Sequence, residues 1–359
     1  MLDQNHSPMA GGPCPSDKRT TDFSPLIREI GRGANGARSL SADEARELYG
    51  AMLDGQVGEL ELGAILIALR MKTESCEEMT GFLQAIGERL PTIPRPSGRI
   101  LPLVIPTYNG ARRSANLSPF VALALQRLGV PVLLHGPDDA DESFGRLSSA
   151  QILRAWGEPI CRTLTQTHQR LVERRLAYLP LSAWMPALAA QLALRRRLGL
   201  RNAAHSLVKM IEPFDGQGVL LTAATHPDYL TNMRQILSRF GRRALLLRAS
   251  EGEAFANPKR CPAIDHLHGG IVDTLCPADT HSLRLLPALP EATVDRTIEW
   301  MTQVFAGELP LPSPLARQLA CCLYACRAAE TLDDATLKIA SHFPRIGDTG
   351  VLTTEEHGS

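Results

Sequence analysis

A polar turn between an expected strand and an expected helix is the first place where this sequence could do chemistry. The stretch Leu103–Phe120 reads LVIPTYNGARRSANLSPF, with an apolar run, a turn at Thr107–Gly110, and then Arg112 and Arg113. In α/β proteins such a junction commonly holds a phosphate group, because backbone amides at the turn point toward the ligand. Here the turn carries a bulky Tyr108 and one glycine, which indicates an altered phosphate cradle.

Arginine is the second chemical signal, and it is concentrated in the middle of the chain. Residues 146–260 hold 18 Lys and Arg against 7 Asp and Glu, whereas the whole chain has 38 of each kind and no net charge. A guanidinium group pairs with phosphate through a planar edge, so the imbalance indicates a localised phosphate-binding surface. A solvated helical face would give the same count. The expected phosphate-contacting residues are Arg112, Arg113, Arg195, Arg196, Arg197, Arg201, Lys209, Arg242, Arg243, Lys259 and Arg260.

Many cations without a recognition motif favour contact with the backbone of a nucleic acid rather than with its bases. The sequence has no zinc-finger spacing and no RNA-binding signature, and only 5% of its residues are aromatic. A long stacking platform for single strands is therefore not expected. Arg201 follows Arg197 by four residues, which predicts that the two lie on one face of a helix. We expect a nucleic-acid partner bound without sequence specificity.

The sequence shows no catalytic motif, no metal-ligand spacing and no membrane-spanning segment. No catalytic residue and no metal ligand is therefore predicted. Eight cysteines show no zinc-ligand spacing, and Cys321, Cys322 and Cys326 lie in an apolar helical run that is expected to pack in the core. His135 and His226 are expected to be packing or capping residues. The sequence shows no signal peptide and no apolar run of about 18 residues, which predicts a cytoplasmic protein with no membrane partner.

The elements that would position these residues alternate in type along the chain. Helical periodicity covers residues 23–90, with capping boxes predicted at Ser41 and Ser75, and the apolar helix at 61–72 is expected to be buried all round. Prolines then introduce short apolar runs that alternate with helices. Strands are expected at 100–107, 130–136, 218–225 and 243–250, and further helices at 118–129, 148–157, 181–214, 226–241, 291–307 and 313–330, with Ser118 as a cap.

This alternation predicts an α/β protein with a discontinuous helical domain and an α/β domain that has a mainly parallel sheet. The helical domain is expected at 21–95, joined by helices in about 165–212. The α/β domain is expected at 96–164 and 213–346. Flexible tails are expected at 1–20 and 347–359.

The order and local text of these segments resemble the anthranilate phosphoribosyltransferase family (glycosyltransferase family 3), which includes relatives among the nucleoside phosphorylases. The resemblance covers about residues 23–344 and is strongest to the YbiB-type paralogues, which are described as DNA-binding proteins. It implies the fold predicted above and a homodimer formed through the helical domain. The matching stretches are IREIGRGANGARSLSADEARELYGAMLDG, ELGAILIALR, VIPTYNGARRSANLSP, RRRLGLRNAAHSL and EGEAFANPKRCP.

Three motifs that handle phosphate or metal in the enzymes are altered in this sequence. A Gly-Thr-Gly-Gly-Asp turn is replaced at Pro106–Gly110, and a Lys-His-Gly-Asn-Arg turn is replaced at Leu134–Asp138. The Asp-Glu pair that binds Mg²⁺ in the family aligns with Ala254 and Phe255, although Glu251 and Glu253 lie nearby. The resemblance therefore implies a degenerate donor site at Thr107, Tyr108, Asn109, Gly110, His135 and Gly136.

These observations leave three functions open. The leading hypothesis is sequence-independent binding of nucleic acid, DNA above all, by a homodimeric and catalytically inactive paralogue with no cofactor. One alternative is an active phosphoribosyltransferase that uses phosphoribosyl pyrophosphate and Mg²⁺ in a reshaped site. Another is a sensor of a small anion or metabolite. In the enzymes an arginine of the RRxLGxR-like segment binds substrate, so Arg197 and Arg201 are also open to an inherited or structural role.

Overall fold

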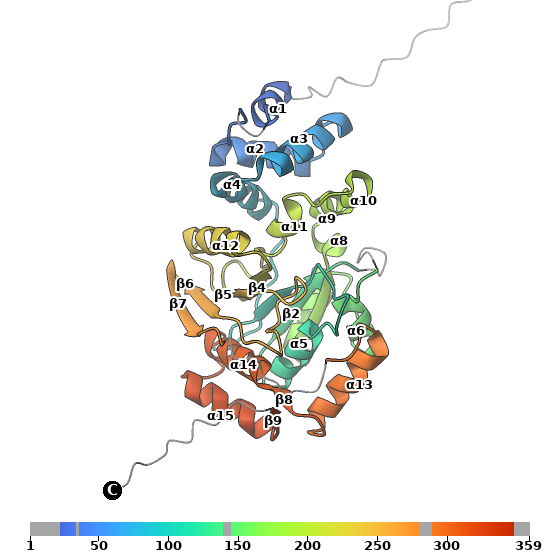
Figure 1. Ribbon diagram of the computed structural model, residues 1–359, viewed down its shortest axis with the longest axis vertical. Coiled ribbons are helices and arrows are strands. Elements are labelled where there is room, and N and C mark those ends of the chain that lie inside the picture. Colours follow the sequence, from blue (N-terminus) through green and yellow to red (C-terminus); the bar gives the residue numbers. More distant parts are fainter. Residues whose placement is uncertain (1–21, 34–35, 139–144, 280–288, 348–359) are drawn as a thin grey trace, which may run out of the picture.

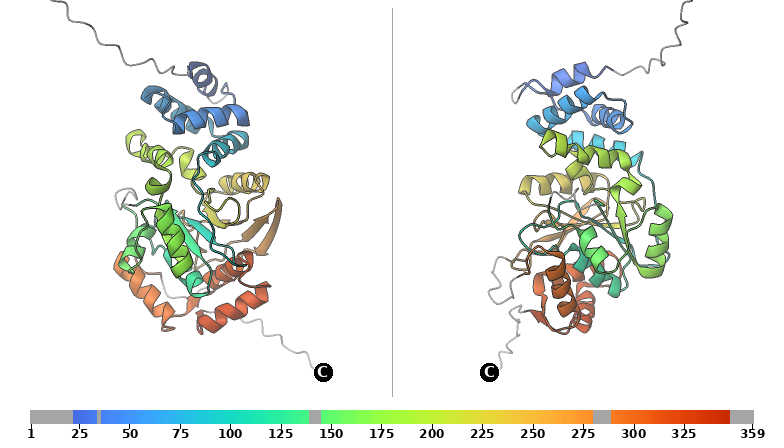
Figure 2. Two further views of the ribbon diagram at one scale, coloured as in Figure 1. Left: turned by 180° about the vertical axis from the view of Figure 1, so that it is seen from behind. Right: turned by 90° about the vertical axis from the view of Figure 1, so that its right-hand side faces the viewer.

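The computed structural model describes residues 22–33, 36–138, 145–279 and 289–347. The tail expected at 1–20 lies outside these residues, as does the tail expected at 347–359 apart from Gly347. The molecule is elongated, with a bundle of helices at one end, a sheet in the middle and the C-terminal helices at the other end (Figure 1). The further views of Figure 2 show the same order of layers.

The N-terminal helices form the tip of the helical domain. They are α1 (Ser24–Ile30), α2 (Ala42–Leu53), α3 (Glu59–Lys72) and α4 (Cys76–Gly87). The predicted capping boxes are confirmed at Ser41 and Ser75. Helices α2 and α4 pack closely because Gly81 has no side chain, since a Cβ there would lie 2.1 Å from the carbonyl oxygen of Ala42. The rings of Tyr49 and Phe82 stack across the same contact at 4.8 Å.

Helix α3 departs from the expectation that it would be buried on all sides. Ile65, Leu66 and Leu69 are buried, but Leu60 is 82% exposed and Met71 is 73% exposed. One face of α3 packs on the other helices, and apolar side chains at its two ends face outward.

A seven-stranded sheet with the order β3-β2-β1-β4-β5-β6-β7 forms the centre of the α/β domain. The first five strands in this order are parallel and the last two pair antiparallel, which confirms a mainly parallel sheet. The strands are β1 (Leu103–Pro106), β2 (Val132–Gly136), β3 (Leu176–Pro180), β4 (Val219–Ala224), β5 (Ala244–Arg248), β6 (Ile264–His268) and β7 (Ile271–Cys276).

Helices cover both faces of this sheet. Those of the α/β domain are α5 (Ser118–Arg127), α6 (Ser149–Ala155), α7 (Leu164–Arg174), α12 (Pro227–Arg239), α13 (Val294–Phe305), α14 (Ser313–Ala325) and α15 (Leu332–His342). A short pair of parallel strands, β8 (Leu311–Pro312) and β9 (Ile346–Gly347), ties α14 to the last described residues. Among the described residues, no helix is both long enough and apolar enough to cross a membrane.

Three expectations about local structure are wrong. Strand β3 pairs with β2 inside the span predicted to be helical from about residue 165, so the chain returns to the helical domain only at Leu181. Gly199, with φ of +72°, ends a short helix at Leu198, so Arg197 and Arg201 do not share a helix. Ser118 lies within the first turn of α5 rather than capping it.

The returning helical stretch is broken into short pieces, α8 (Leu181–Trp184), α9 (Pro186–Ala193), α10 (Arg195–Leu198) and α11 (Ala204–Leu207). The sheet separates two apolar cores, because successive strand residues point to opposite faces. Leu103 and Ile105 of β1 join the core under α5 and α14, whereas Val104 joins the core shared with the helical domain. Cys321 and Cys322 of α14, and Cys326 directly after it, are buried as predicted.

Candidate functional site

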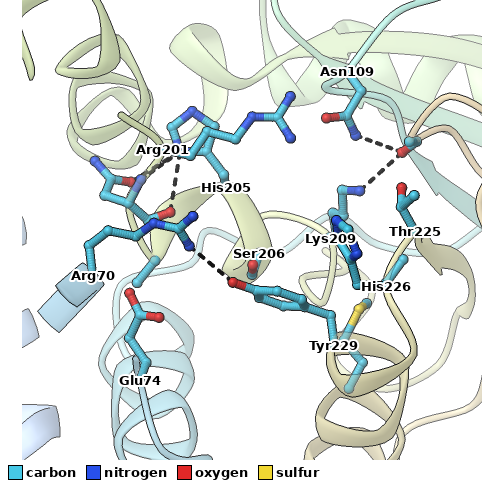
Figure 3. Close-up of a pocket in the computed structure, with 15 residues that line it drawn as sticks. Arg70, Glu74, Asn109, Arg201, His205, Ser206, Lys209, Thr225, His226 and Tyr229 are labelled. Carbon is cyan, nitrogen blue, oxygen red and sulfur yellow. Dashed lines mark hydrogen bonds between the residues drawn. The ribbon is translucent and has the colours of Figure 1, made fainter. Parts of the chain in front are cut away.

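A pocket of about 240 Å³ lies where the helical domain meets the carboxyl ends of the parallel strands (Figure 3). Asn109 follows β1, Thr225 follows β4 and Gly252 follows β5, so three neighbouring strands deliver their next residues to this place. Ligands of parallel α/β proteins bind at this edge of the sheet. The helical domain supplies the opposite wall, with Arg70, Arg201, Asn202, Ala203, His205, Ser206 and Lys209.

Three cations face the pocket. Lys209 Nζ donates hydrogen bonds to the carbonyl oxygens of Gly252 at 3.0 Å and Ala223 at 3.3 Å, and burial lowers the pKa of Lys209 to about 8. Arg70 Nη1 donates to the hydroxyl of Tyr229 at 3.1 Å (Figure 3). The guanidinium of Arg201 makes no hydrogen bond or salt bridge with any residue of the described ranges, which leaves its donors for a ligand.

The positive charge continues from the pocket to the neighbouring surface. Burial lowers the pKa of Arg201, and the nearby charges of Arg195 and Arg146 lower it further. The pKa of Arg195 is lowered by burial and by Arg146 and Arg112. These shifts mean that the guanidinium groups lie close enough to repel one another, which raises the positive potential of the cleft.

Most of the other arginines of the expected set lie on the surface near this pocket. Arg112, Arg113, Arg196 and Arg197 are exposed beside this cleft or on α10, and Arg197 pairs with Glu59 of α3 at 3.0 Å. We name the group Arg112, Arg113, Arg195 and Arg196 the rim.

Four members of the expected set lie elsewhere. Arg242 and Arg243 precede β5 and therefore sit at the amino ends of the strands, across the sheet from the pocket. Arg242 pairs with Glu212 at 3.1 Å, and Arg243 donates to the carbonyl oxygen of Gly216 at 2.9 Å. Lys259 and Arg260 are exposed in the loop before β6. Arg70 and Arg146 join the cleft although sequence reasoning did not single them out, because Arg70 lies on α3 of the separate helical domain.

The altered turn after β1 still binds an anion, but the anion belongs to the chain itself. Glu253 accepts hydrogen bonds from the backbone amides of Asn109 at 2.8 Å and Gly110 at 2.6 Å. Burial raises the pKa of Glu253, while these amides and the charge of Lys209 oppose the rise. A Cβ on Gly110, which has φ of +63°, would lie 2.9 Å from the carbonyl oxygen of Leu147, so the turn requires glycine there.

A second carboxylate occupies the next amides of the same loop. Glu251 accepts hydrogen bonds from the backbone amides of Arg112 at 2.6 Å, Arg113 at 3.0 Å and Ser114 at 3.0 Å. Burial opposes the charge of Glu251, but these amides and the Ser114 hydroxyl hold its pKa below the ordinary value. The amides of residues 109, 110 and 112–114, which a phosphate would use, are therefore bound to Glu251 and Glu253, and the amide of Ala111 donates to the carbonyl oxygen of Leu147.

The end of β2 and the residues after it are bonded to side chains of neighbouring segments. Tyr108 and His135 share a hydrogen bond of 2.6 Å, and burial lowers the pKa of His135 to about 3, so the ring is neutral. The backbone of Gly136 lies directly against the turn after β1, because a Cβ there would lie 2.3 Å from the carbonyl oxygen of Thr107. The carboxylate of Asp138 pairs with two arginines, Arg154 and Arg162. The structure thus brings the expected donor-site residues together.

The residues present do not fit the Mg²⁺ that the enzymes use. Ala254 and Phe255, at the positions of the Asp-Glu pair, are buried in the apolar core and offer no side-chain oxygen. Magnesium needs several convergent oxygen ligands, and the oxygens of Glu251 and Glu253 already accept backbone amides. Within the described ranges, no three His, Cys, Asp or Glu side chains gather as a metal site would require.

Comparison with known proteins agrees with this architecture. The helical bundle domain of the glycosyl transferase family matches residues 24–89. The uncharacterized protein YbiB of Escherichia coli K12 is 40% identical over 326 residues, which cover 90% of this chain and all of YbiB. Anthranilate phosphoribosyltransferase of Synechococcus elongatus is 31% identical over 217 residues, 60% of this chain and 61% of the enzyme.

Solved structures show the same fold. The anthranilate phosphoribosyltransferase of Thermus thermophilus matches with a TM-score of 0.67 and 19% identity, over 88% of this chain and 94% of the enzyme. The Saccharomyces cerevisiae enzyme in complex with PRPP and Mg matches with a TM-score of 0.67 and 12% identity, over 89% and 92% of the two chains. The near-complete match to YbiB and the shared fold show that this chain belongs to the YbiB family of anthranilate phosphoribosyltransferase-like proteins.

Proposed function

We propose that this protein binds nucleic acid, DNA above all, through its phosphate backbone and without reading sequence, and that it does not transfer phosphoribosyl groups. One observation carries the proposal: in this cleft the backbone amides are already bound, whereas the arginines beside them remain positioned for phosphate. The backbone amides that would hold a diphosphate are bound to Glu251 and Glu253. Beside them, Arg195 lies close enough to Arg112, Arg146 and Arg201 for the positive charges to repel one another, which favours a polyanion at the cleft.

A polymer explains this distribution of charge better than a small donor does. Arg112, Arg113 and Arg196 are exposed outside the pocket, where a small ligand inside it would not reach them. A nucleic acid has a phosphate at every nucleotide and can contact the rim and the pocket mouth together. Base recognition is not expected, because within the described ranges no large aromatic side chain is exposed at the rim for stacking.

We also propose that the protein acts as a homodimer joined through the helical domain. The two apolar side chains exposed at the ends of α3, Leu60 and Met71, support this, because a second copy would remove them from water. A dimer would present two rims to one polymer and raise the avidity of binding. We expect Leu60→Glu with Met71→Glu to give a monomer in sedimentation, whereas Leu337→Glu, at an equally exposed leucine on α15, leaves the dimer intact.

Fluorescence anisotropy with a labelled duplex of about 20 base pairs, titrated at several salt concentrations, tests the binding proposal. We expect affinity to fall steeply with salt and to be the same for two unrelated sequences. The double variant Arg112→Ala with Arg113→Ala is expected to weaken binding to both sequences and to reduce the slope of log affinity against log salt by about 2, one for each lost contact. Arg296→Ala, an exposed and paired arginine on α13, is the matched control. Absence of binding at low salt overturns the proposal.

A small anion in the same pocket is the second candidate, and the guanidinium donors of Arg201 favour it. Calorimetry with inorganic phosphate and with phosphoribosyl pyrophosphate plus Mg²⁺ separates the candidates. Binding of nucleic acid without saturable binding of either small ligand supports the proposal. Saturable binding of phosphoribosyl pyrophosphate that requires Mg²⁺ would restore the transferase alternative.

A further inference from the structure

Two cysteine thiols lie against each other at the antiparallel side of the sheet, and neither lines the candidate pocket. The Sγ atoms of Cys261 and Cys276 are 3.6 Å apart. Cys261 lies in the loop before β6, and Cys276 ends β7 opposite Ile264 of β6. The antiparallel pairing of β6 and β7 fixes the two backbones side by side, so the contact between the thiols is built into the sheet.

Each cysteine of the pair is followed by a proline, and this sequence feature restricts both backbones. A residue before proline is confined to extended conformations, because the proline ring clashes with the helical ones. Each thiol also lies 3.6 Å from the carbonyl oxygen of its own proline, Pro262 or Pro277. A disulfide has an S–S length of about 2.0 Å, so the sulfurs need to approach by less than the width of an atom.

The surroundings favour one thiolate beside one thiol. The hydrogen bond from Cys261 lowers the pKa of Cys276 to about 7, burial opposes this, and the charge of Arg317 on α14 lowers it further. The same hydrogen bond, together with burial, raises the pKa of Cys261. Arg317 is kept beside the pair by Asp279, whose carboxylate lies 3.7 Å from its guanidinium.

A small reagent can reach the pair from the side of Cys261, although both residues are almost completely buried. Cys261 lines a cavity of about 530 Å³ together with Arg248, Arg260, Asp265 and Asp279. The exposed fractions of Cys261 and Cys276 are 3% and 6%, so bulky disulfides are excluded while a molecule as small as a peroxide can enter. Thiolate character and access are the two conditions for selective oxidation of a cysteine.

We propose that Cys261 and Cys276 form a reversible redox pair that a small hydroperoxide converts to a disulfide. The Cys276 thiolate attacks one oxygen of hydrogen peroxide, the O–O bond breaks, and hydroxide leaves to give a sulfenic acid. That hydroxide takes the proton of the Cys261 thiol and becomes water. The Cys261 thiolate then attacks the sulfenic sulfur, forming the S–S bond and releasing a second hydroxide. Both sulfurs are oxidised, and the peroxide is reduced. The bond would fasten the loop that carries Lys259 and Arg260 to the end of β7.

Peptide mass spectrometry on the full-length protein tests this proposal. The reduced protein is treated with hydrogen peroxide, its remaining thiols are alkylated, and it is digested. We expect one cross-linked peptide joining Cys261 to Cys276, lighter by two hydrogens than its parts and cleaved by dithiothreitol. Cys321 and Cys322 of α14, and Cys326 directly after it, are expected to stay reduced, because burial raises the pKa of each thiol.

Serine variants and a measurement of thermal stability distinguish a specific cross-link from nonspecific oxidation. Cys261→Ser and Cys276→Ser are each expected to abolish the cross-link. Cys321→Ser, which removes another thiol close to Cys276, is expected to leave it intact. Peroxide is expected to raise the thermal midpoint of the wild type and to leave that of Cys276→Ser unchanged, because the bond restricts the unfolded chain. A cross-link of Cys276 to Cys321, or oxidation of Cys261 and Cys276 without any cross-link, overturns the proposal.

Discussion

Glu253 Oε1 accepts a hydrogen bond of 2.6 Å from the backbone amide of Gly110, so the loop after β1 is bound to a carboxylate of its own chain. The two residues are 143 positions apart, and the hydrogen bond joins the loop after β1 to the loop after β5. Lys209, whose ammonium binds the carbonyl oxygen of the neighbouring Gly252, lies beside this contact. The contact keeps a strand–turn–helix junction in the geometry of a phosphate site while its amides are already satisfied.

The first prediction concerns the carboxylate that holds the amides of residues 112–114. Glu251→Gln keeps the size of the side chain but removes a negative charge beside the rim arginines Arg112 and Arg113. We expect the affinity for duplex DNA to rise, because one repulsive charge is lost, and the free energy of unfolding to fall by about 1–3 kcal/mol, because charge-assisted bonds to the amides weaken. Anisotropy titration and urea unfolding measure the two effects.

The matched control for this variant is Glu299→Gln, which removes the same charge from an exposed pair with Arg296 on α13. It is expected to leave both quantities nearly unchanged, because exposed ion pairs contribute little. Equal effects of the two variants on DNA affinity would mean that the total charge of the protein, and not the position of Glu251, controls binding.

The second prediction distinguishes the carboxyl ends of the strands, where the cleft lies, from their amino ends. Arg195→Ala is expected to weaken DNA binding with little loss of stability, because Arg195 lies at the cleft among other arginines. Arg242→Ala is expected to leave binding unchanged and to lower the free energy of unfolding by about 1–3 kcal/mol, because it leaves the buried carboxylate of Glu212 without its cation. Weaker binding by the Arg242 variant would place nucleic acid at the amino ends of the strands instead.

The third prediction is a dependence of stability on pH. Burial lowers the pKa of His135 and of His205 to about 3, and the charges of Arg201 and Arg195 add to the shift at His205. Between about pH 6.5 and pH 3 the unfolded chain binds protons that the folded protein does not bind. The free energy of unfolding should therefore fall as the pH falls through this window, by up to about 1.4 kcal/mol per pH unit for each histidine.

Urea unfolding at about pH 7, 6, 5 and 4 measures this slope. His205→Gln is expected to reduce it, because the variant removes one group that takes up a proton on unfolding. A variant slope equal to that of the wild type would show that His205 is protonated in the folded protein, and would contradict its burial beside Arg201.

The fourth prediction concerns a buried ion pair within the helical domain. The side chain of Glu78 is fully buried. Its carboxylate accepts hydrogen bonds from the Lys72 ammonium at 2.7 Å, the Leu40 backbone amide at 2.9 Å and the Ser75 backbone amide at 2.7 Å. Lys72→Ala leaves this carboxylate without its cation, and we expect the free energy of unfolding to fall by about 3–5 kcal/mol. Lys338→Ala, in an exposed pair with Asp334, is expected to cost less than about 1 kcal/mol by the same urea measurement.

The local signals of the sequence were strong wherever a single element decides its own structure. The capping boxes at Ser41 and Ser75, the strand at Leu103–Pro106 and the buried cysteines of α14 follow from spacing and apolar runs, which are properties of short windows. Strand β3 was missed because it is only five residues long and follows a helix directly, so its residues read as a continuation of that helix.

The sequence by itself determined the altered motifs, the excess of arginine in the middle of the chain and, through its resemblance, the fold. Only the tertiary structure decided which arginines meet. Arg70 and Arg201 reach one pocket from separate stretches of the helical domain, while Arg242 lies at the amino end of β5, opposite the strand ends that line the pocket. It also decided that Glu251 and Glu253 bind the amides of residues 109, 110 and 112–114. That contact forms because β4 lies between β1 and β5 in the sheet, which brings the loops after β1 and β5 together. Spacing along a chain fixes which residues share an element, but contacts between distant loops follow from the order in which strands pair.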